Sequence, residues 1–140
     1  MNYHFRECVI VVFAMLLIGA TVGCNKDPYD IVELEGVATF DGKPLHNVNL
    51  IFRPKDDSGK TSTALVTDPG GKFVVAYSAN RKGVKAGDIE ICVGVIDMSG
   101  FEANEAGKAA IEQYGYQAPR LSINLTKSDK NYILDLKPRK

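Results

Sequence analysis

The chain has 140 residues, of which 45% are hydrophobic and 24% are charged, and this composition suits one globular domain with an additional segment. Its 17 basic and 17 acidic residues balance to a net charge of zero. Because no basic run carries interleaved aromatic residues, the sequence argues against nucleic acid as a partner.

An export signal is predicted at the N-terminus. After a short polar start, residues 8–25 hold no charged side chain, and most of them are apolar. The segment closes on T-V-G-C, residues 21–24, which resembles the lipobox of bacterial lipoprotein precursors, except that such boxes usually carry Leu where this chain has Thr21. The resemblance implies that residues 1–23 are a signal peptide removed before Cys24, and that Cys24 becomes a lipidated N-terminus held in a membrane.

Two alternatives to lipidation stay open. One is an ordinary cleaved signal, and the other is an uncleaved anchor, since the uncharged stretch approaches the ~20 residues that span a bilayer. In all three cases the domain leaves the cytoplasm. Residues 24–30 form a short polar tether, in which Asn25 follows Cys24. By resemblance to the sorting rule of some Gram-negative lipoproteins, this Asn favours the outer membrane.

The positions of the cysteines agree with this interpretation. Cys8 lies in the predicted signal and Cys24 is the predicted lipid site, so Cys92 alone remains and no disulfide is expected within the mature chain. Cys92 lies inside the apolar run I-E-I-C-V-G-V-I. A lone cysteine in such a run is predicted to be a small core residue rather than a nucleophile.

Seven short strands are predicted in the domain, which covers residues 31–137. Each shows alternating or continuous apolar residues between turn-forming residues. The predicted strands cover residues 31–40, 48–54, 61–67, 73–77, 89–96, 121–125 and 132–136. Short strands at this spacing, without long helices, predict an all-β fold, either a β-sandwich or a Greek-key barrel.

The best-defined part of the domain is the stretch 36–54. Asp41-Gly42 is a turn dipeptide, because Gly accepts a positive φ and Asp bonds its own backbone. Pro44 lacks a backbone donor, so neither flanking strand is expected to continue through it. The two strands therefore form a β-arch or a hairpin. Their apolar residues share one face on each side of the turn: Leu34, Gly36, Ala38 and Phe40, and then Val48, Leu50 and Phe52.

Other segments show weaker patterns. The strand at 61–67 is rich in Thr, which predicts an edge position or a solvated face. Residues 78–88 are predicted to be a loop. Residues 98–120 interrupt the β pattern, and within them E-A-N-E-A-G-K-A-A-I-E-Q-Y predicts one or two helical turns, weakened by Gly107, that cross one end of the sandwich.

The order of several motifs resembles a known family. G-V-A-T-F-D-G-K-P-L followed by V-N-L-I-F-R-P is similar to the start of carboxypeptidase-regulatory-like domains, also called transthyretin-like or prealbumin-like domains. The similarity continues through T-D-P-G-G-K-F, G-V-K-A-G-D-I-E-I-C-V, I-E-Q-Y-G-Y-Q-A-P-R-L-S-I-N-L and D-K-N-Y-I-L-D-L, an order similar to small lipoproteins of planctomycete-type bacteria. The resemblance implies a seven-stranded Greek-key β-sandwich outside the cytoplasm. It does not imply carboxypeptidase activity, because these modules accompany enzymes.

No catalytic or metal-binding pattern is found. The mature chain has one histidine, His46, and contains neither H-x-x-E nor C-x-x-C, so no metal site and no cofactor are predicted. G-x-S-x-G is absent as well, and the acidic run at 56–59 lacks the ligand pattern of a calcium loop. Transthyretin-like hydroxyisourate hydrolases, a distant resemblance, need several histidines and a Y-R-G-S-type tail, whereas this chain ends L-K-P-R-K. We therefore expect no enzyme activity.

Three aromatic residues are candidates for a binding patch: Phe101, Tyr114 and Tyr116. Aromatic side chains on the end loops of a sandwich can stack on sugars or contact a protein, or they can close the open end of the core. Together these features predict a non-catalytic, membrane-anchored lipoprotein of the cell envelope, whose β-sandwich is a binding or structural module for an envelope protein or glycan. The alternative is an accessory subunit that docks onto an envelope enzyme or secretion complex.

Overall fold

The computed structural model describes residues 28–140. The predicted signal peptide and its lipidation residue, Cys24, lie outside the described residues. The described chain is mostly β, with one α-helix, α2 (Glu105–Tyr114). The strands are β1 (Ile31–Val32), β2 (Leu34–Phe40), β3 (Lys43–Pro44), β4 (Val48–Pro54), β5 (Ser62–Val66), β6 (Lys72–Val74), β7 (Ala76–Ser78), β8 (Arg81–Lys82), β9 (Val84–Lys85), β10 (Gly87–Val95), β11 (Leu121–Leu125) and β12 (Asp129–Leu136).

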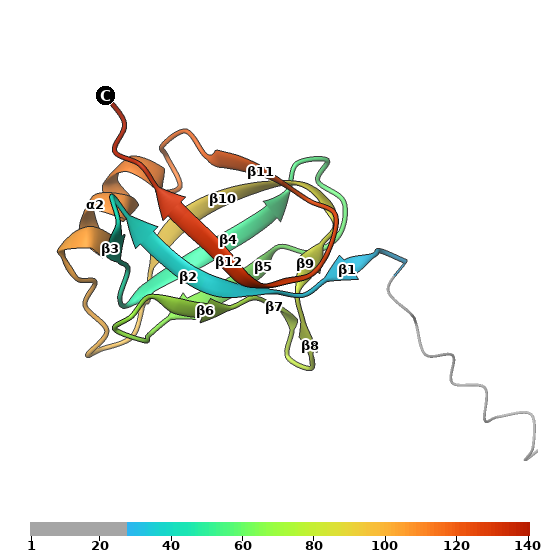
Figure 1. Cartoon of the computed structure of the whole chain (residues 1–140), viewed down its shortest axis with the longest axis horizontal. Helices are drawn as coiled ribbons and strands as arrows, with labels where there is room; N and C mark the ends of the chain where they lie inside the picture. Colours follow the sequence, from blue (N-terminus) through green and yellow to red (C-terminus); the bar gives the residue numbers. More distant parts are fainter. Residues whose placement is uncertain (1–27) are drawn as a thin grey trace, which may run out of the picture.

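Two sheets enclose one hydrophobic core, and α2 lies at one end of them (Figure 1). The larger sheet has the strand order β11-β10-β4-β5-β7-β8, and its pairs are antiparallel. The smaller sheet is built on β2, which pairs with β12 along one edge and with β3 and β6 along the other. A separate two-stranded ladder joins β1 and β9.

The stretch from β2 to β4 contains a hairpin and a β-arch: β2 pairs with β3 across the Asp41-Gly42 turn, and residues 45–47 then cross to the larger sheet. β2 belongs to the smaller sheet and β4 to the larger one, so these two strands face each other across the core instead of pairing. Asp41 and Gly42 have φ values of 51° and 76°, the positive values that a two-residue turn into β3 requires. The predicted apolar faces are confirmed, because the following side chains are all buried: Leu34, Ala38, Phe40, Val48, Leu50 and Phe52.

The predicted strand 73–77 crosses from one sheet to the other. β6 pairs with β2 in the smaller sheet, whereas β7 pairs with β5 in the larger sheet. Val75 lies between them, where its N–H donates to the carbonyl of Leu34 at 2.9 Å and its own carbonyl accepts from the N–H of Gly83 at 2.8 Å. The prediction of one strand was therefore wrong, because the alternation of buried side chains continues through a change of hydrogen-bond partner.

The prediction that residues 78–88 form a loop is also wrong, since this segment contains β8, β9 and the start of β10. Strands of two residues carry too little periodicity to be recognised from sequence. The Thr-rich strand β5, by contrast, has the solvated face that its composition predicts, because Thr63 and Leu65 are exposed while Ser62, Ala64 and Val66 are buried.

The helix α2 is longer and more buried than the sequence pattern predicts. Its 10 residues make about three turns, and Asn104 caps it by accepting a hydrogen bond from the N–H of Gly107 at 2.8 Å. A Cβ on Gly107 would lie 2.7 Å from Val48 Cγ1, so this glycine allows the helix to approach the core closely. Small residues thus replace the large apolar residues expected of a core helix. The buried positions are Ala106, Gly107, Ala110 and Tyr114.

Candidate functional site

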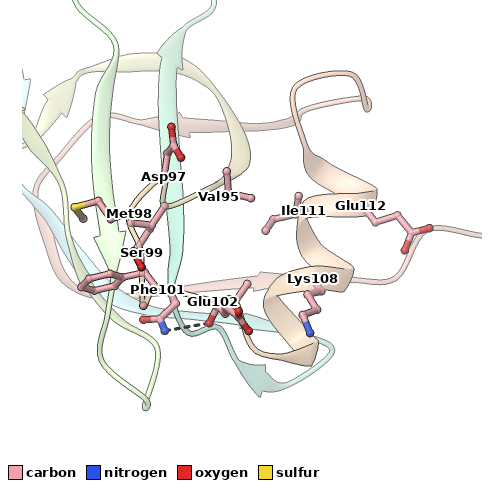
Figure 2. A pocket seen from close by; sticks show the side chains of 13 residues that line it. Val95, Asp97, Met98, Ser99, Phe101, Glu102, Lys108, Ile111 and Glu112 are labelled. Carbon is pink, nitrogen blue, oxygen red and sulfur yellow. Dashed lines mark hydrogen bonds between the residues drawn. The ribbon is translucent and has the colours of Figure 1, made fainter.

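A pocket of about 720 Å³ lies at the helix end of the sandwich, between α2 and the segment that follows β10. Three of the exposed large hydrophobic side chains of the described domain line it: Val95 is 64% exposed, Met98 is 53% exposed and Phe101 is 36% exposed. Val95 and Ile111 point toward each other from β10 and from α2 (Figure 2). Exposed apolar side chains gathered at one hollow are typical of a binding surface.

The rim of this helix-end pocket is mainly acidic. Asp97, Glu102 and Glu112 contribute carboxylates, and Lys108 contributes one ammonium group. The Nζ atom of Lys108 lies 3.2 Å from Oε1 of Glu105, so its charge is already balanced within α2. The pocket therefore combines an apolar interior with a negative rim.

Two asparagines hold the loops around this pocket. Asn47, with φ of 54°, donates from Nδ2 to the carbonyl of Glu102 at 3.0 Å (Figure 2). Asn104 donates from Nδ2 to the carbonyl of Pro44 at 2.9 Å, and its Oδ1 accepts from the N–H of His46 at 3.3 Å. Neither asparagine is among the candidate residues predicted from the sequence. The pattern N-E-A-G before a helical run is an N-cap signal that could have identified Asn104.

His46 belongs to the loop that Asn104 holds. Its Nε2 atom is 3.2 Å from the carbonyl oxygen of Thr67. Within residues 28–140, no group of three or more His, Cys, Asp or Glu side chains is placed to hold a metal ion. The contacts of His46 are those of a residue that fixes a turn.

Tyr114 belongs to the core and not to a binding patch. It is 5% exposed, and its hydroxyl donates to the carbonyl of Lys137 at 2.6 Å. The guanidinium carbon of Arg139 lies 3.9 Å from the centre of the Tyr114 ring. The expectation that Tyr114 contacts a ligand is therefore corrected, and the alternative that it closes the end of the core describes its position.

Phe101 and Tyr116 are more exposed, but they line different pockets. Phe101 is in the helix-end pocket, whereas Tyr116, 67% exposed, lines a hollow of about 330 Å³ on the outer face of the larger sheet. The structure therefore does not bring Phe101, Tyr114 and Tyr116 together into one surface.

The hollow beside Tyr116, called the sheet-face pocket below, has a polar lining. Nη1 of Arg120 donates to Oε2 of Glu90 at 2.8 Å, and this hydrogen bond is the largest of the effects that raise the pKa of Arg120. Cys92 also lines the pocket but is only 4% exposed, and burial raises the pKa of its thiol. A buried thiol with a raised pKa is poorly suited to nucleophilic chemistry, as the sequence pattern predicts.

Comparison of the chain with protein-family models, with curated proteins and with solved structures finds no match. In the described part of the chain, no helix is long and apolar enough to cross a membrane. Function is therefore inferred from the residues of this chain.

Proposed function

We propose that this chain is a non-catalytic lipoprotein of the cell envelope, held on a membrane, by preference the outer membrane, through lipid on Cys24. The β-sandwich is a binding module, and the helix-end pocket is its binding site. The apolar segment that precedes T-V-G-C supports the anchor. The apolar interior and acidic rim of the pocket support binding, since soluble domains rarely leave apolar side chains gathered in one hollow.

The observation that carries this proposal is that the start of the described chain and the helix-end pocket lie at opposite ends of the sandwich. The described chain starts near β1 at one end of the sandwich, while α2 lies at the opposite end (Figure 1). Tyr29 is held at the β1 end, because Lys85 Nζ lies 5.1 Å from the centre of its ring and 2.7 Å from Oδ2 of Asp56. A lipid on Cys24 would therefore direct the helix-end pocket away from the bilayer.

The tether keeps the domain near the membrane. Cys24 precedes Ile31 by seven residues, and a fully extended chain of that length spans at most about 25 Å. A sandwich held so close presents its far end to other envelope components. In this arrangement the β1 end is attached to the membrane, and the helix end recognises a partner.

We also propose that residues 31–137 form a seven-stranded Greek-key sandwich of the transthyretin-like kind. The support is the resemblance of the motifs around 36–54, the β-arch between β2 and β4 and the two sheets around one core. In this proposal the two-residue strands β1, β3, β8 and β9 are additions, and β6 and β7, which Val75 joins, count as one of the seven principal strands.

A position-specific cross-linking experiment in intact cells tests the binding site. A photoreactive phenylalanine replaces Met98, which lines the helix-end pocket, or Ile133, which is 74% exposed on the smaller sheet and serves as the matched control. We expect a discrete adduct from position 98 and none from position 133. Equal adducts from the two positions, or none from position 98, would contradict the assignment.

The accessory-subunit function is a second candidate, favoured by the apolar character of the helix-end pocket. Val95, Met98 and Phe101 suit a protein side chain better than a hydrated polymer. An accessory subunit would copurify with an envelope enzyme or secretion complex at a fixed molar ratio. A module that binds transiently would show no fixed ratio, so quantitative mass spectrometry of the purified, cross-linked protein distinguishes the two candidates.

A further inference from the structure

The sheet-face pocket contains an aromatic platform. Tyr116 is 67% exposed and lies over the outer face of the larger sheet beside Gly94 and Ile51. A Cβ on Gly94 would lie 3.6 Å from Tyr116 Cε2, an ordinary contact distance, and 3.3 Å from Ile51 Cδ1, so the tyrosine ring lies close to the strand at this position. The tyrosine thus has support below it while most of its surface faces solvent.

Charged groups of both signs surround this platform. Arg120 pairs with Glu90 at 2.8 Å, and Arg53 pairs with Asp57 through Nη2 and Nε. The two pairs balance in charge. A guanidinium carries five N–H groups, and Arg120 uses one nitrogen in its bond to Glu90, so further donors remain beside the ring. Arg53, Glu90 and Arg120 all line the pocket, together with Thr61.

We propose that the sheet-face pocket binds a neutral saccharide. The apolar face of a sugar ring stacks on Tyr116, and the sugar hydroxyls bond to the guanidinium groups of Arg53 and Arg120 and to the carboxylate of Glu90. Sugar hydroxyls both donate and accept hydrogen bonds, which matches a lining that offers donors and acceptors side by side. The balanced charge favours a neutral polymer over an acidic one.

The size of the pocket fits a small unit of such a polymer. Its volume of about 330 Å³ is at the lower end of the range for ligand pockets, about 300–1,000 Å³. That volume suits one sugar ring or a short segment. The sheet-face pocket shares no lining residue with the helix-end pocket. Saccharide binding is therefore a function in addition to the one proposed above, and it does not depend on the lipid.

The test is co-sedimentation of the detergent-solubilised full-length chain with chitin, cellulose or cross-linked dextran in high salt. We expect retention on at least one of these neutral polymers. Tyr116→Ala should lower the apparent affinity about tenfold, since the variant loses both the stacking contact and the apolar area that the sugar covers. Tyr116→Phe should keep most of the binding, because it keeps the ring.

A matched variant controls for the loss of an exposed apolar side chain elsewhere on the domain. Ile133→Ala should sediment like the wild type, and urea unfolding of Tyr116→Ala should show that the exposed position contributes little to stability. No retention on any of the three polymers, or equal retention of wild type and Tyr116→Ala, would overturn the proposal. So would preferential binding to acidic alginate that salt abolishes, or a protein partner captured through Tyr116 in place of a polysaccharide. None of these results bears on membrane attachment through Cys24.

Discussion

Asp135 shows how a single side chain joins distant parts of this chain. Its Oδ1 accepts hydrogen bonds from Thr39 Oγ1 at 2.8 Å and from the N–H of Gly42 at 3.3 Å, while Lys137 pairs with its other oxygen. Lys137 is the main cause that holds the pKa of Asp135 below its ordinary value, and Thr39 is the next. The carboxylate thus links β12 to the turn at Asp41-Gly42.

The lowered pKa of Asp135 predicts a stability that decreases in acid. The folded chain binds this proton more weakly than the unfolded chain does, so the contribution is present above the unfolded pKa, about 3.9, and is lost as the pH falls through the folded pKa. Between pH 7 and pH 3, Asp135→Asn should therefore lose less unfolding free energy than the wild type. Thr39→Val, which keeps the carboxyl group but removes one donor, should lie between them. Equal losses in the three proteins, measured by urea unfolding, would contradict the assignment.

Tyr114 and Tyr116 show which side-chain positions can be predicted from the sequence and which cannot. Both are aromatic and both flank Gly115, so composition alone treats them alike. The helix ends at Tyr114, and the spacing of Ala106, Ala110 and Tyr114 places these three side chains on one buried face. That spacing is visible in the sequence. The position of Tyr116 over Gly94 is a contact between distant segments, and no local pattern predicts it.

At the scale of elements, local sequence patterns predict turns and buried faces correctly, but they do not predict which strands pair with each other. The Asp41-Gly42 turn and the buried face of β10 follow from neighbouring residues, and both are present, with Ile89, Ile91 and Val93 fully buried. Val95 continues the alternation of Ile89, Ile91 and Val93 but is 64% exposed, because it is the last residue of the strand and lies beside the helix-end pocket. The change of sheet at Val75 and the parallel pairing of β2 with β12 depend on segments far apart in the chain.

The pairing of β2 with β12 requires a glycine at position 36. The register between these parallel strands shifts between Asp129 and Tyr132, as at a β-bulge, and a Cβ on Gly36 would overlap the carbonyl oxygen of Tyr132. Because backbone atoms form this contact, no side-chain movement relieves it.

Gly36→Ala should therefore lower the free energy of unfolding by about 3 kcal/mol, at the upper end of the cost of overpacking. Gly42→Ala is the matched control, since no atom lies within 4 Å of its added Cβ and only its positive φ is unfavourable, at a cost of about 1 kcal/mol. Urea unfolding of the two variants gives the comparison. A Gly36→Ala variant as stable as Gly42→Ala would show that β2 and β12 do not approach this closely.

At the scale of the whole molecule, the proposed attachment and the proposed recognition site lie at opposite ends of the fold. The described chain begins at β1, and α2 lies at the other end of the sandwich (Figure 1). The Lys85 contacts with Tyr29 belong to the first end, and the helix-end pocket is lined by residues of α2 at the second. The net charge of zero predicts no general attraction to charged surfaces, so the proposed binding would rely on local features such as the acidic rim and the Tyr116 platform. The sequence identified the candidate anchor, but it could not reveal either pocket, because each is assembled from segments that only the fold brings together.

The central claim is that Cys24 carries the lipid that holds this domain on a membrane. Its most direct test is mass spectrometry of the N-terminal peptide, residues 24–26 after trypsin, from protein purified out of the membrane fraction. We predict that the chain begins at Cys24 and that this peptide carries the added mass of fatty acyl groups. A chain that begins upstream of Cys24, or an unmodified Cys24, would contradict the account and favour an uncleaved anchor or an ordinary signal peptide.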